Sequence, residues 1–321
     1  MKKNLWVLDC ALKDFFVKRK NVSLKVPRPE KRRLSNLSTA SICLLPGTII
    51  FGTFNIFPII YSGYLSLLTW DGLSTQREFA GFSNYAQLFV SGEFWNSILV
   101  TLYYMAGLTA LSIITGLLIA LALNEKVKGR LFFRTLYFIP VVTSTIAGAI
   151  VWRYLFDPGS GFINIFLRSF GLRGPGWLNS SLWAMPTVIS LGVWKRLGFN
   201  MIIYLAGLQS ISKEYYEAAK VDGAGRMARF TRITLPLLTP ITSMLVIMSV
   251  IDSFLVFDQI FVMTSGGPLK STDVIGFLLY RFAFRYFKLG FASAVGCLIF
   301  ILIFIITIFQ RKFLRLNGET Y

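Results

Sequence analysis

The side chains of this 321-residue chain that could do chemistry are charged and amide groups placed inside strongly apolar stretches. Residues 183–208 and 237–263 hold most of them, and the polar positions there are Lys195, Arg196, Asn200, Asp252, Ser253, Asp258 and Gln259. Charge is costly to place in lipid, so intramembrane polar residues are candidates for a substrate path. A second interpretation stays open: Lys195 or Arg196 pairs with Asp252 or Asp258 across helices and serves packing alone.

Other features argue against catalysis by this chain. It has no histidine, the commonest acid/base group and metal ligand, and its three cysteines are scattered with no metal or disulfide spacing. The 15 acidic residues form no convincing catalytic pair. The segment GGPLKST resembles a phosphate-binding loop only superficially, because Pro268 and Leu269 separate its second glycine from the lysine. We therefore predict no catalytic residue, no metal site and no cofactor bound by this chain.

The elements that must position the polar residues are membrane-spanning helices. The chain is 55% hydrophobic, above the 45–50% usual for soluble domains. A bilayer core of roughly 30 Å needs about 20 apolar residues in a helix. Six segments meet this requirement, approximately residues 41–68, 97–123, 131–156, 183–208, 237–263 and 291–309. The predicted fold class is all-α, a polytopic membrane protein with six transmembrane helices.

The distribution of basic residues predicts the orientation. The two termini and the loops on their side carry 23 of the 33 Lys and Arg, the alternate loops carry 7, and 3 lie within spans. This positive-inside pattern makes both termini cytoplasmic and explains the net charge of +18 without nucleic acid. The outer loop 266–288 is unusually basic, and we expect a short helix there, lying along the interface or dipping back into the protein.

The ends of the chain form separate parts in this interpretation. Residues 1–38 are predicted to be a cytoplasmic extension with an amphipathic helix on the membrane surface, or else a disordered basic tail. Residues 39–315 are the six-helix domain, and residues 316–321 are a cytoplasmic tail.

The most charged stretch in the middle of the chain, EYYEAAKVDGAGRMARFTRITLP, falls in the cytoplasm between the fourth and fifth spans. Ser212 is a plausible N-cap for a short helix, and Asp222–Gly223 is a turn signal at which a positive φ is expected. We expect a second short helix to follow, until Leu235–Pro236 redirects the chain into the membrane. A short helix across the end of a bundle is either a docking element for a partner or a solvated loop helix.

This stretch resembles the EAA motif of importer permeases of the ATP-binding cassette (ABC) type. The matching residues are Glu217, Ala218, Ala219, Gly223, Ile233, Leu235 and Pro236. The segments GFSNYAQLF, FFRTLYFIPVVTSTIAGAIVWRYLFDPGSGFIN and VMTSGGPLKSTDVIGFLLYRFAF resemble the carbohydrate branch of that family, the first permease of each pair. The resemblance covers residues from about 40 to 315.

The resemblance implies a type I importer permease fold in a bacterial inner membrane. Residues 212–234 would form the coupling helix, seated in a groove of a cytoplasmic ATPase subunit. The ATPase-coupling residues would be Glu217, Ala218, Ala219, Asp222, Gly223 and Pro236. The implied partners are a second permease, two ATPase subunits that carry ATP and Mg, an extracytoplasmic solute-binding protein, and a sugar or oligosaccharide.

The resemblance also places the substrate path between the fourth and fifth spans. This favours Asn200, Ser253 and Gln259 as lining residues. With the intramembrane charges, the candidate path residues are Arg196, Asn200, Asp252, Ser253, Asp258 and Gln259. Trp194, Phe199 and Phe257 are candidate stacking partners for sugar faces. Lys195 and Arg196 hint at an anion, so glycerol phosphate, acidic and neutral oligosaccharides stay open. A secondary transporter would need an ion-coupling site and inverted repeats, neither of which is visible.

Overall fold

The computed structural model describes residues 33–125 and 128–315, and the chain divides into two compact units at residues 59 and 60. The amphipathic helix predicted in the N-terminal extension and the tail 316–321 lie outside the described residues. The described part is predominantly helical, which confirms the predicted fold class.

The first unit is a helix with one widened turn. It contains α2 (Arg33–Phe51), the π-helix η1 (Gly52–Ile56) and the start of α3 (Phe57–Leu65). Ile42, Ile49 and Phe54 each expose more than half of their surface. Ser41–Leu65 is long and apolar enough to span a membrane.

The second unit begins with a short hairpin and the longest helix. Leu68–Thr69 (β1) pairs antiparallel with Glu78–Phe79 (β2). The helices that follow up to residue 179 are α4 (Ser83–Val90), α5 (Gly92–Asn124), α6 (Arg130–Val142), α7 (Thr145–Leu155), α8 (Phe162–Ser169) and the 3-10 turn η2 (Trp177–Asn179).

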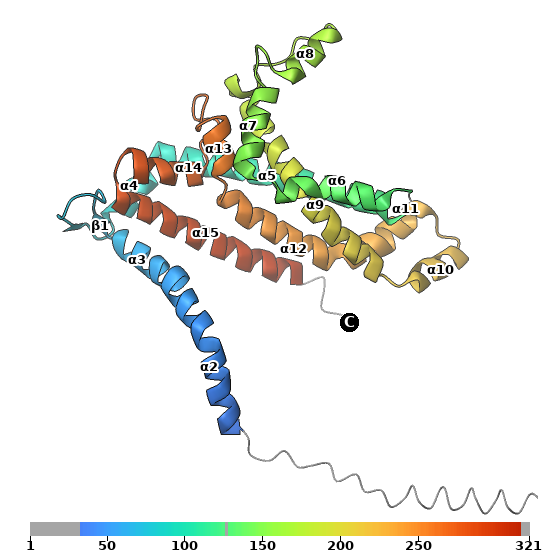
Figure 1. The fold of residues 1–321 in the computed structure, drawn as a ribbon, viewed down its shortest axis with the longest axis horizontal. Helices are drawn as coiled ribbons and strands as arrows, with labels where there is room; N and C mark the ends of the chain where they lie inside the picture. The colour runs from blue at the N-terminus through green and yellow to red at the C-terminus, as the bar shows by residue number, and fades with distance from the viewer. Residues whose placement is uncertain (1–32, 126–127, 316–321) are drawn as a thin grey trace, which may run out of the picture. The chain divides into compact units, whose positions relative to one another are not determined.

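The second half of this unit contains the charged stretch 214–236 and the last spans. Its helices are α9 (Ala184–Ser210), α10 (Lys213–Val221), α11 (Arg226–Arg229), η3 (Phe230–Thr234), α12 (Leu235–Phe254), α13 (Asp258–Met263), α14 (Ile275–Tyr280), η4 (Arg281–Arg285) and α15 (Leu289–Arg315). Figure 1 shows α5, α9, α12 and α15 running side by side, with α10 at one end of the bundle and α4 and α14 toward the other.

Five helices in the described residues are long and apolar enough to cross a membrane, and a sixth span is added if the pair α6 and α7 counts as one. These segments correspond to the six predicted spans. The third span differs in shape, because α6 and α7 meet at an angle of 99°. The fifth differs in extent, because α12 ends at Phe254 and the separate helix α13 covers the rest of the predicted segment.

The prediction of a second short helix that ends at Leu235–Pro236 was wrong. α11, η3 and α12 run on as one helix from Arg226 to Phe254. The turn before Pro236 is a π-helix, in which the N–H of Leu235 donates to the carbonyl of Phe230. Pro236 lies inside this continuous helix and directly follows the widened turn. Its missing N–H is tolerated there because the widened turn already interrupts the regular hydrogen-bond pattern of the helix.

Small residues set the packing of the central helices. A side chain at Gly198 of α9 would place its Cβ 2.1 Å from the carbonyl oxygen of Tyr137 on α6, and one at Gly116 of α5 would lie 2.6 Å from Cβ of Asn200. Glycine at such crossings lets two backbones approach closely, as is common between membrane helices. α9 is thereby held against both α5 and α6.

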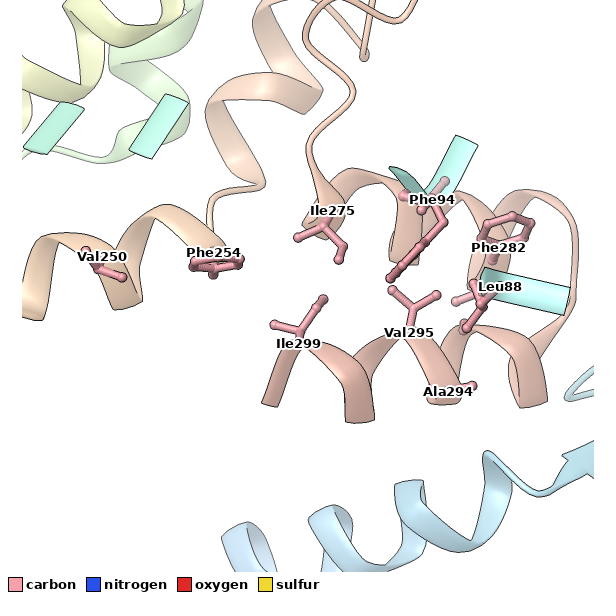
Figure 2. Close-up of a cluster of buried hydrophobic side chains, with 12 residues drawn as sticks. Leu88, Phe94, Val250, Phe254, Ile275, Phe282, Ala294, Val295 and Ile299 are labelled. Atoms are coloured by element: carbon pink, nitrogen blue, oxygen red, sulfur yellow. The ribbon is translucent and has the colours of Figure 1, made fainter. Parts of the chain in front are cut away.

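A hydrophobic cluster holds α15 to the rest of the unit. Figure 2 shows Phe94, Ile275 and Phe282 directed toward Val295 and Ile299 of α15. Two further buried clusters follow α9 along its length, one with α5, α7 and α13 and the other with α5 and α12. The core of the second unit therefore lies on both sides of α9 and under α14.

The basic outer loop is tied down by ion pairs. The short helix predicted there is present as α14, continued by η4. Lys270 Nζ lies 2.5 Å from Glu93 Oε1, and Arg281 lies 3.3 Å from Glu93 and 2.8 Å from Asp273. Burial raises the pKa of the Asp273 carboxyl, although Arg281 opposes that shift. The loop has four basic residues, and two of them, Lys270 and Arg281, are held in ion pairs within the protein.

Arg281→Met should destabilise this loop strongly. Asp273 is only 1% exposed, so the substitution leaves a buried carboxylate without its closest counter-charge. Breaking one partner of such a pair costs about 3 kcal/mol, which unfolding of the purified protein in detergent, followed by tryptophan fluorescence, will measure. Arg285→Met is the matched control, since Arg285 is exposed and makes no ion pair in the part of the chain described. Equal losses in the two variants would contradict the structural role of Arg281.

Candidate functional site

A cavity of about 440 Å³ lies where two broken spans meet α9. It opens beside the break between α6 and α7 and beside the break between α12 and α13. Non-helical backbone is tolerated at membrane depth where it lines a cavity, and discontinuous helices often form transporter binding sites. The polar lining residues are Tyr104, Thr145, Lys195, Arg196, Asp252, Asp258 and Gln259.

Four of the six predicted path residues line this cavity, and two do not. The lining four are Arg196, Asp252, Asp258 and Gln259. Asn200 is fully buried one turn beyond Arg196, where its amide donates to the carbonyl of Ser112 at 3.0 Å. Ser253 is fully buried and donates to the carbonyl of Ser249 at 2.7 Å, within its own helix. The close crossing of α5 at Gly116 covers the α9 surface around Asn200.

Arg196 and Asp252 form an ion pair between α9 and α12. The side chain of Arg196 is 12% exposed, whereas that of Asp252 is 55% exposed. The pairing that the sequence left open is therefore present, yet both partners also line the cavity. A substrate that entered would meet this pair as part of the wall.

Lys195 caps the bent span. Its ammonium donates to the carbonyl of Pro140, at 2.8 Å, and to that of Thr143. The last carbonyls of a helix have no partner within it, and Lys side chains commonly satisfy them. Lys195 thus supplies hydrogen bonds that the 99° bend between α6 and α7 removes.

Lys195→Met should loosen this bend. Two carbonyls at partly buried positions would lose their donor, at a cost of about 2 kcal/mol. The measurement is the midpoint of unfolding in detergent. Arg153→Met is the control, because Arg153 is an exposed cation on α7 with one long contact, 3.4 Å to the carbonyl of Val262. If the control lost as much stability as Lys195→Met, the capping role would be refuted.

Aromatic residues border the cavity. Phe199 and Phe257 line it, whereas Trp194 packs on Trp152 with ring centroids 4.7 Å apart and does not line it. Tyr104 of α5 also lines the cavity and is hydrogen-bonded to the amide of Gln259. Sequence analysis did not select Tyr104, because it is one of several aromatic residues in an otherwise apolar span.

Helix α10 and the turn that follows it have the predicted local structure. The Ser212 hydroxyl accepts the N–H of Glu214 at 3.3 Å, which confirms the N-cap of α10. Gly223 ends the helix with a φ of +74°, as expected for the turn. The N–H groups of Gly223 and Ala224 close the helix end by donating to the carbonyls of Lys220 and Ala219.

The two sides of α10 differ. Glu217, Ala218, Asp222 and Gly223 are exposed, whereas Ala219 is half-buried. Tyr216, also half-buried, lies 3.0 Å from the hydroxyl of Thr234 and ties α10 to the base of α12. Pro236 is exposed but belongs to the continuous α12, away from α10. Four of the six predicted coupling residues therefore form an open surface on one short segment.

No group of three or more His, Cys, Asp or Glu that could hold a metal occurs among residues 33–125 and 128–315.

Known proteins are similar to this chain over most of its length. A profile described as "Binding-protein-dependent transport system inner membrane component" matches residues 112–316. The multiple sugar-binding transport system permease MsmF of Streptococcus mutans is 35% identical, over 84% of this chain and 92% of its own length. The trehalose/maltose transport system permease MalF of Thermococcus litoralis is 35% identical, over 87% of this chain and 94% of its own.

Two further matches widen the range of substrates among the relatives. The sn-glycerol-3-phosphate transport system permease UgpA of Yersinia pestis is 31% identical, over 85% of this chain and 93% of its own. A chain in the crystal structure of a bacterial alginate ABC transporter, in complex with an alginate pentasaccharide-bound periplasmic protein, has a TM-score of 0.79 and 27% identity. The match covers 90% of this chain and 99% of that one.

Proposed function

The chain belongs to the family of inner-membrane components of binding-protein-dependent transport systems, and we propose that it is the permease subunit of an ATP-driven importer of neutral saccharides. The protein is a permease of the ABC type.

We infer the substrate class from which charged side chains of the cavity are already paired within the protein. Lys195 is occupied by two backbone carbonyls and Arg196 by Asp252. Asp258 lines the cavity, is exposed, and makes no ion pair within the residues described. The free charge is therefore an acceptor for sugar hydroxyls, and Phe199 and Phe257 offer apolar faces.

An acidic saccharide is the second candidate. It is favoured by the similarity to the alginate transporter and by the presence of Arg196 in the wall. Binding of a carboxylate there would require Arg196 to exchange Asp252 for the substrate. A neutral sugar needs no such exchange.

The partners follow from the family. We infer a second permease of similar topology, two ATPase subunits that bind ATP and Mg, and an extracytoplasmic solute-binding protein. The exposed side of α10 supports docking of an ATPase, because Glu217 and Ala218 face away from the bundle. Closure of the ATPase dimer would move α10 and shift the bundle between its inward- and outward-facing states.

The test is uptake by the reconstituted complex with its solute-binding protein. We expect ATP-dependent uptake of a neutral oligosaccharide, with little uptake of uronate oligomers or glycerol 3-phosphate. Asp258→Asn should lower the apparent affinity for the neutral sugar about tenfold, since a hydrogen bond to a charged group contributes about 1.5 kcal/mol or more. Preferred uptake of uronates would select the second candidate, and ATP-independent uptake without ATPase subunits would indicate a secondary transporter.

The orientation of the chain gives a further prediction. With both termini cytoplasmic, a cysteine at Leu269, which is 91% exposed, should react with an impermeant reagent from outside intact cells, and one at Asn317 should not. The background variant replaces Cys10, Cys43 and Cys297 with serine, so that only the introduced thiol reports. Equal labelling at the two positions would overturn the six-span topology.

A further inference from the structure

A second large pocket lies under α10, apart from the cavity lined by Arg196 and Asp252. Its volume is about 560 Å³, and it is bounded by the end of α5, the end of α9, the inner side of α10 and the start of α11 with η3. Three cations line it, namely Lys220, Arg226 and Arg229, together with one carboxylate, Glu125.

The three cations of this pocket lack ion-pair partners among the described residues. Nε of Arg229 is buried and has no hydrogen-bond partner. Like charges that share a pocket raise its free energy, and an unpartnered buried donor adds to that cost. A bound anion would relieve both.

The backbone places these cations on either side of one turn. Lys220 lies in the last turn of α10, and Gly223 reverses the chain with its positive φ. Arg226 and Arg229 are three residues apart in α11, so they share one face of that helix. An anion held by Lys220 and the two arginines would brace α10 against the base of α12.

We propose that this pocket binds a phosphate group, presented by an anionic phospholipid of the inner leaflet or by a free phosphate anion. Arginine forks match phosphate oxygens, and lysine adds a point charge. The depth favours the lipid: Asn124 is the last residue of the span α5, and Arg226 is the first residue of the apolar span Arg226–Phe254. Basic pockets at the cytoplasmic ends of membrane helices suit lipid headgroups, which are anionic on that side. The choice of leaflet depends on the proposed orientation.

The test measures binding without transport. The whole transporter complex, purified in detergent, is incubated with phosphatidylglycerol, with phosphatidylcholine or with inorganic phosphate, and bound molecules are counted by native mass spectrometry. We expect the wild type to retain phosphatidylglycerol over phosphatidylcholine. Each of Lys220→Gln, Arg226→Gln and Arg229→Gln should weaken this binding about fivefold, given about 1 kcal/mol per cation near an anionic surface.

Two variants sharpen the result. Arg232→Gln is the matched control, because Arg232 is an exposed cation of the neighbouring turn that does not line the pocket, and its binding should match the wild type. Glu125→Gln removes the one carboxylate among the described residues that line this pocket and should strengthen binding about fivefold. Displacement of the lipid by equimolar inorganic phosphate would assign the site to the free anion, still by phosphate chemistry.

Three outcomes would overturn the proposal. The first is equal retention of the two lipids by the wild type. The second is undiminished phosphatidylglycerol binding by a variant that carries Lys220→Gln, Arg226→Gln and Arg229→Gln together. The third is carbodiimide cross-linking of Lys220 to an ATPase carboxylate, with no lipid bound. The unfolding midpoint of each variant shows whether it is folded. Because binding is counted directly, a wrong substrate assignment for the transporter would leave these results unchanged.

Discussion

Replacing Gly223 with valine should abolish uptake and substrate-stimulated ATP hydrolysis while the permease still inserts into the membrane. Gly223 has a φ of +74° at the end of α10, a backbone conformation in which a β-branched residue is a genuine outlier. A Cβ there would meet no atom within 4 Å. The effect is therefore one of backbone conformation, and it would redirect the exposed residues Glu217 and Ala218 away from a docked ATPase.

Gly225 provides a matched control for this experiment. It lies two residues further on, its Cβ would also meet nothing within 4 Å, and its φ of −67° with ψ of 170° is an extended conformation that valine adopts readily. Gly225→Val should retain most uptake. Gly223→Asn should fall between the two valine variants, because asparagine tolerates positive φ better than other residues. Uptake by Gly223→Val equal to that of Gly225→Val would show that the turn does not set the coupling.

The measured quantities should separate docking from coupling. Co-purification of the ATPase subunits with Gly223→Val reports whether α10 still docks. ATP hydrolysis with and without substrate-loaded binding protein reports whether the permease still stimulates the ATPase subunits. Expression and membrane insertion should be unchanged, because the apolar spans are untouched. Normal docking with unstimulated hydrolysis would place the defect in coupling.

Features set by local sequence were predictable. The six apolar segments, the Ser212 cap and the turn at Gly223 depend on residues within a few positions of each other. The charge pairing of Arg196 with Asp252 was also foreseen as an alternative, because opposite charges in lipid have few other partners. Local propensity and the cost of charge in lipid carry this information in a single sequence.

Features set by contact between distant segments were not predictable. Asn200 is polar and one turn from Arg196, yet the approach of α5 at Gly116 covers it. The apolar run 237–263 does not reveal that the helix stops at Phe254, nor that Lys195 caps a bend 52 residues before it. Tyr104 acquires its place only because Gln259 lies opposite. Each of these depends on three-dimensional neighbours that no alternation of apolar and polar residues encodes.

The ion pair of Arg196 and Asp252 gives the second prediction of large effect. Asp252→Leu should cost about 3 kcal/mol, because it leaves Arg196, 12% exposed, without a counter-charge. Arg196→Met should cost less, about 1 kcal/mol, because Asp252 is 55% exposed and water can hydrate it. The double variant should recover stability to within about 1 kcal/mol of the wild type, since no unpaired charge remains. Asp258→Leu is the stability control, because Asp258 makes no ion pair in the described residues.

Uptake by the same variants separates the two interpretations of this pair. If the pair serves packing alone, the double variant should recover uptake to the same extent as it recovers stability. If the pair is also part of the substrate wall, uptake should stay below about a tenth of the wild type even where stability has returned, because loss of a hydrogen bond between a sugar and a charged group costs about 1.5 kcal/mol or more. We expect the second result, since both side chains line the cavity between the two broken spans. Full uptake by a stable double variant would remove Arg196 and Asp252 from the path, although Asp258 and Gln259 would still line the cavity.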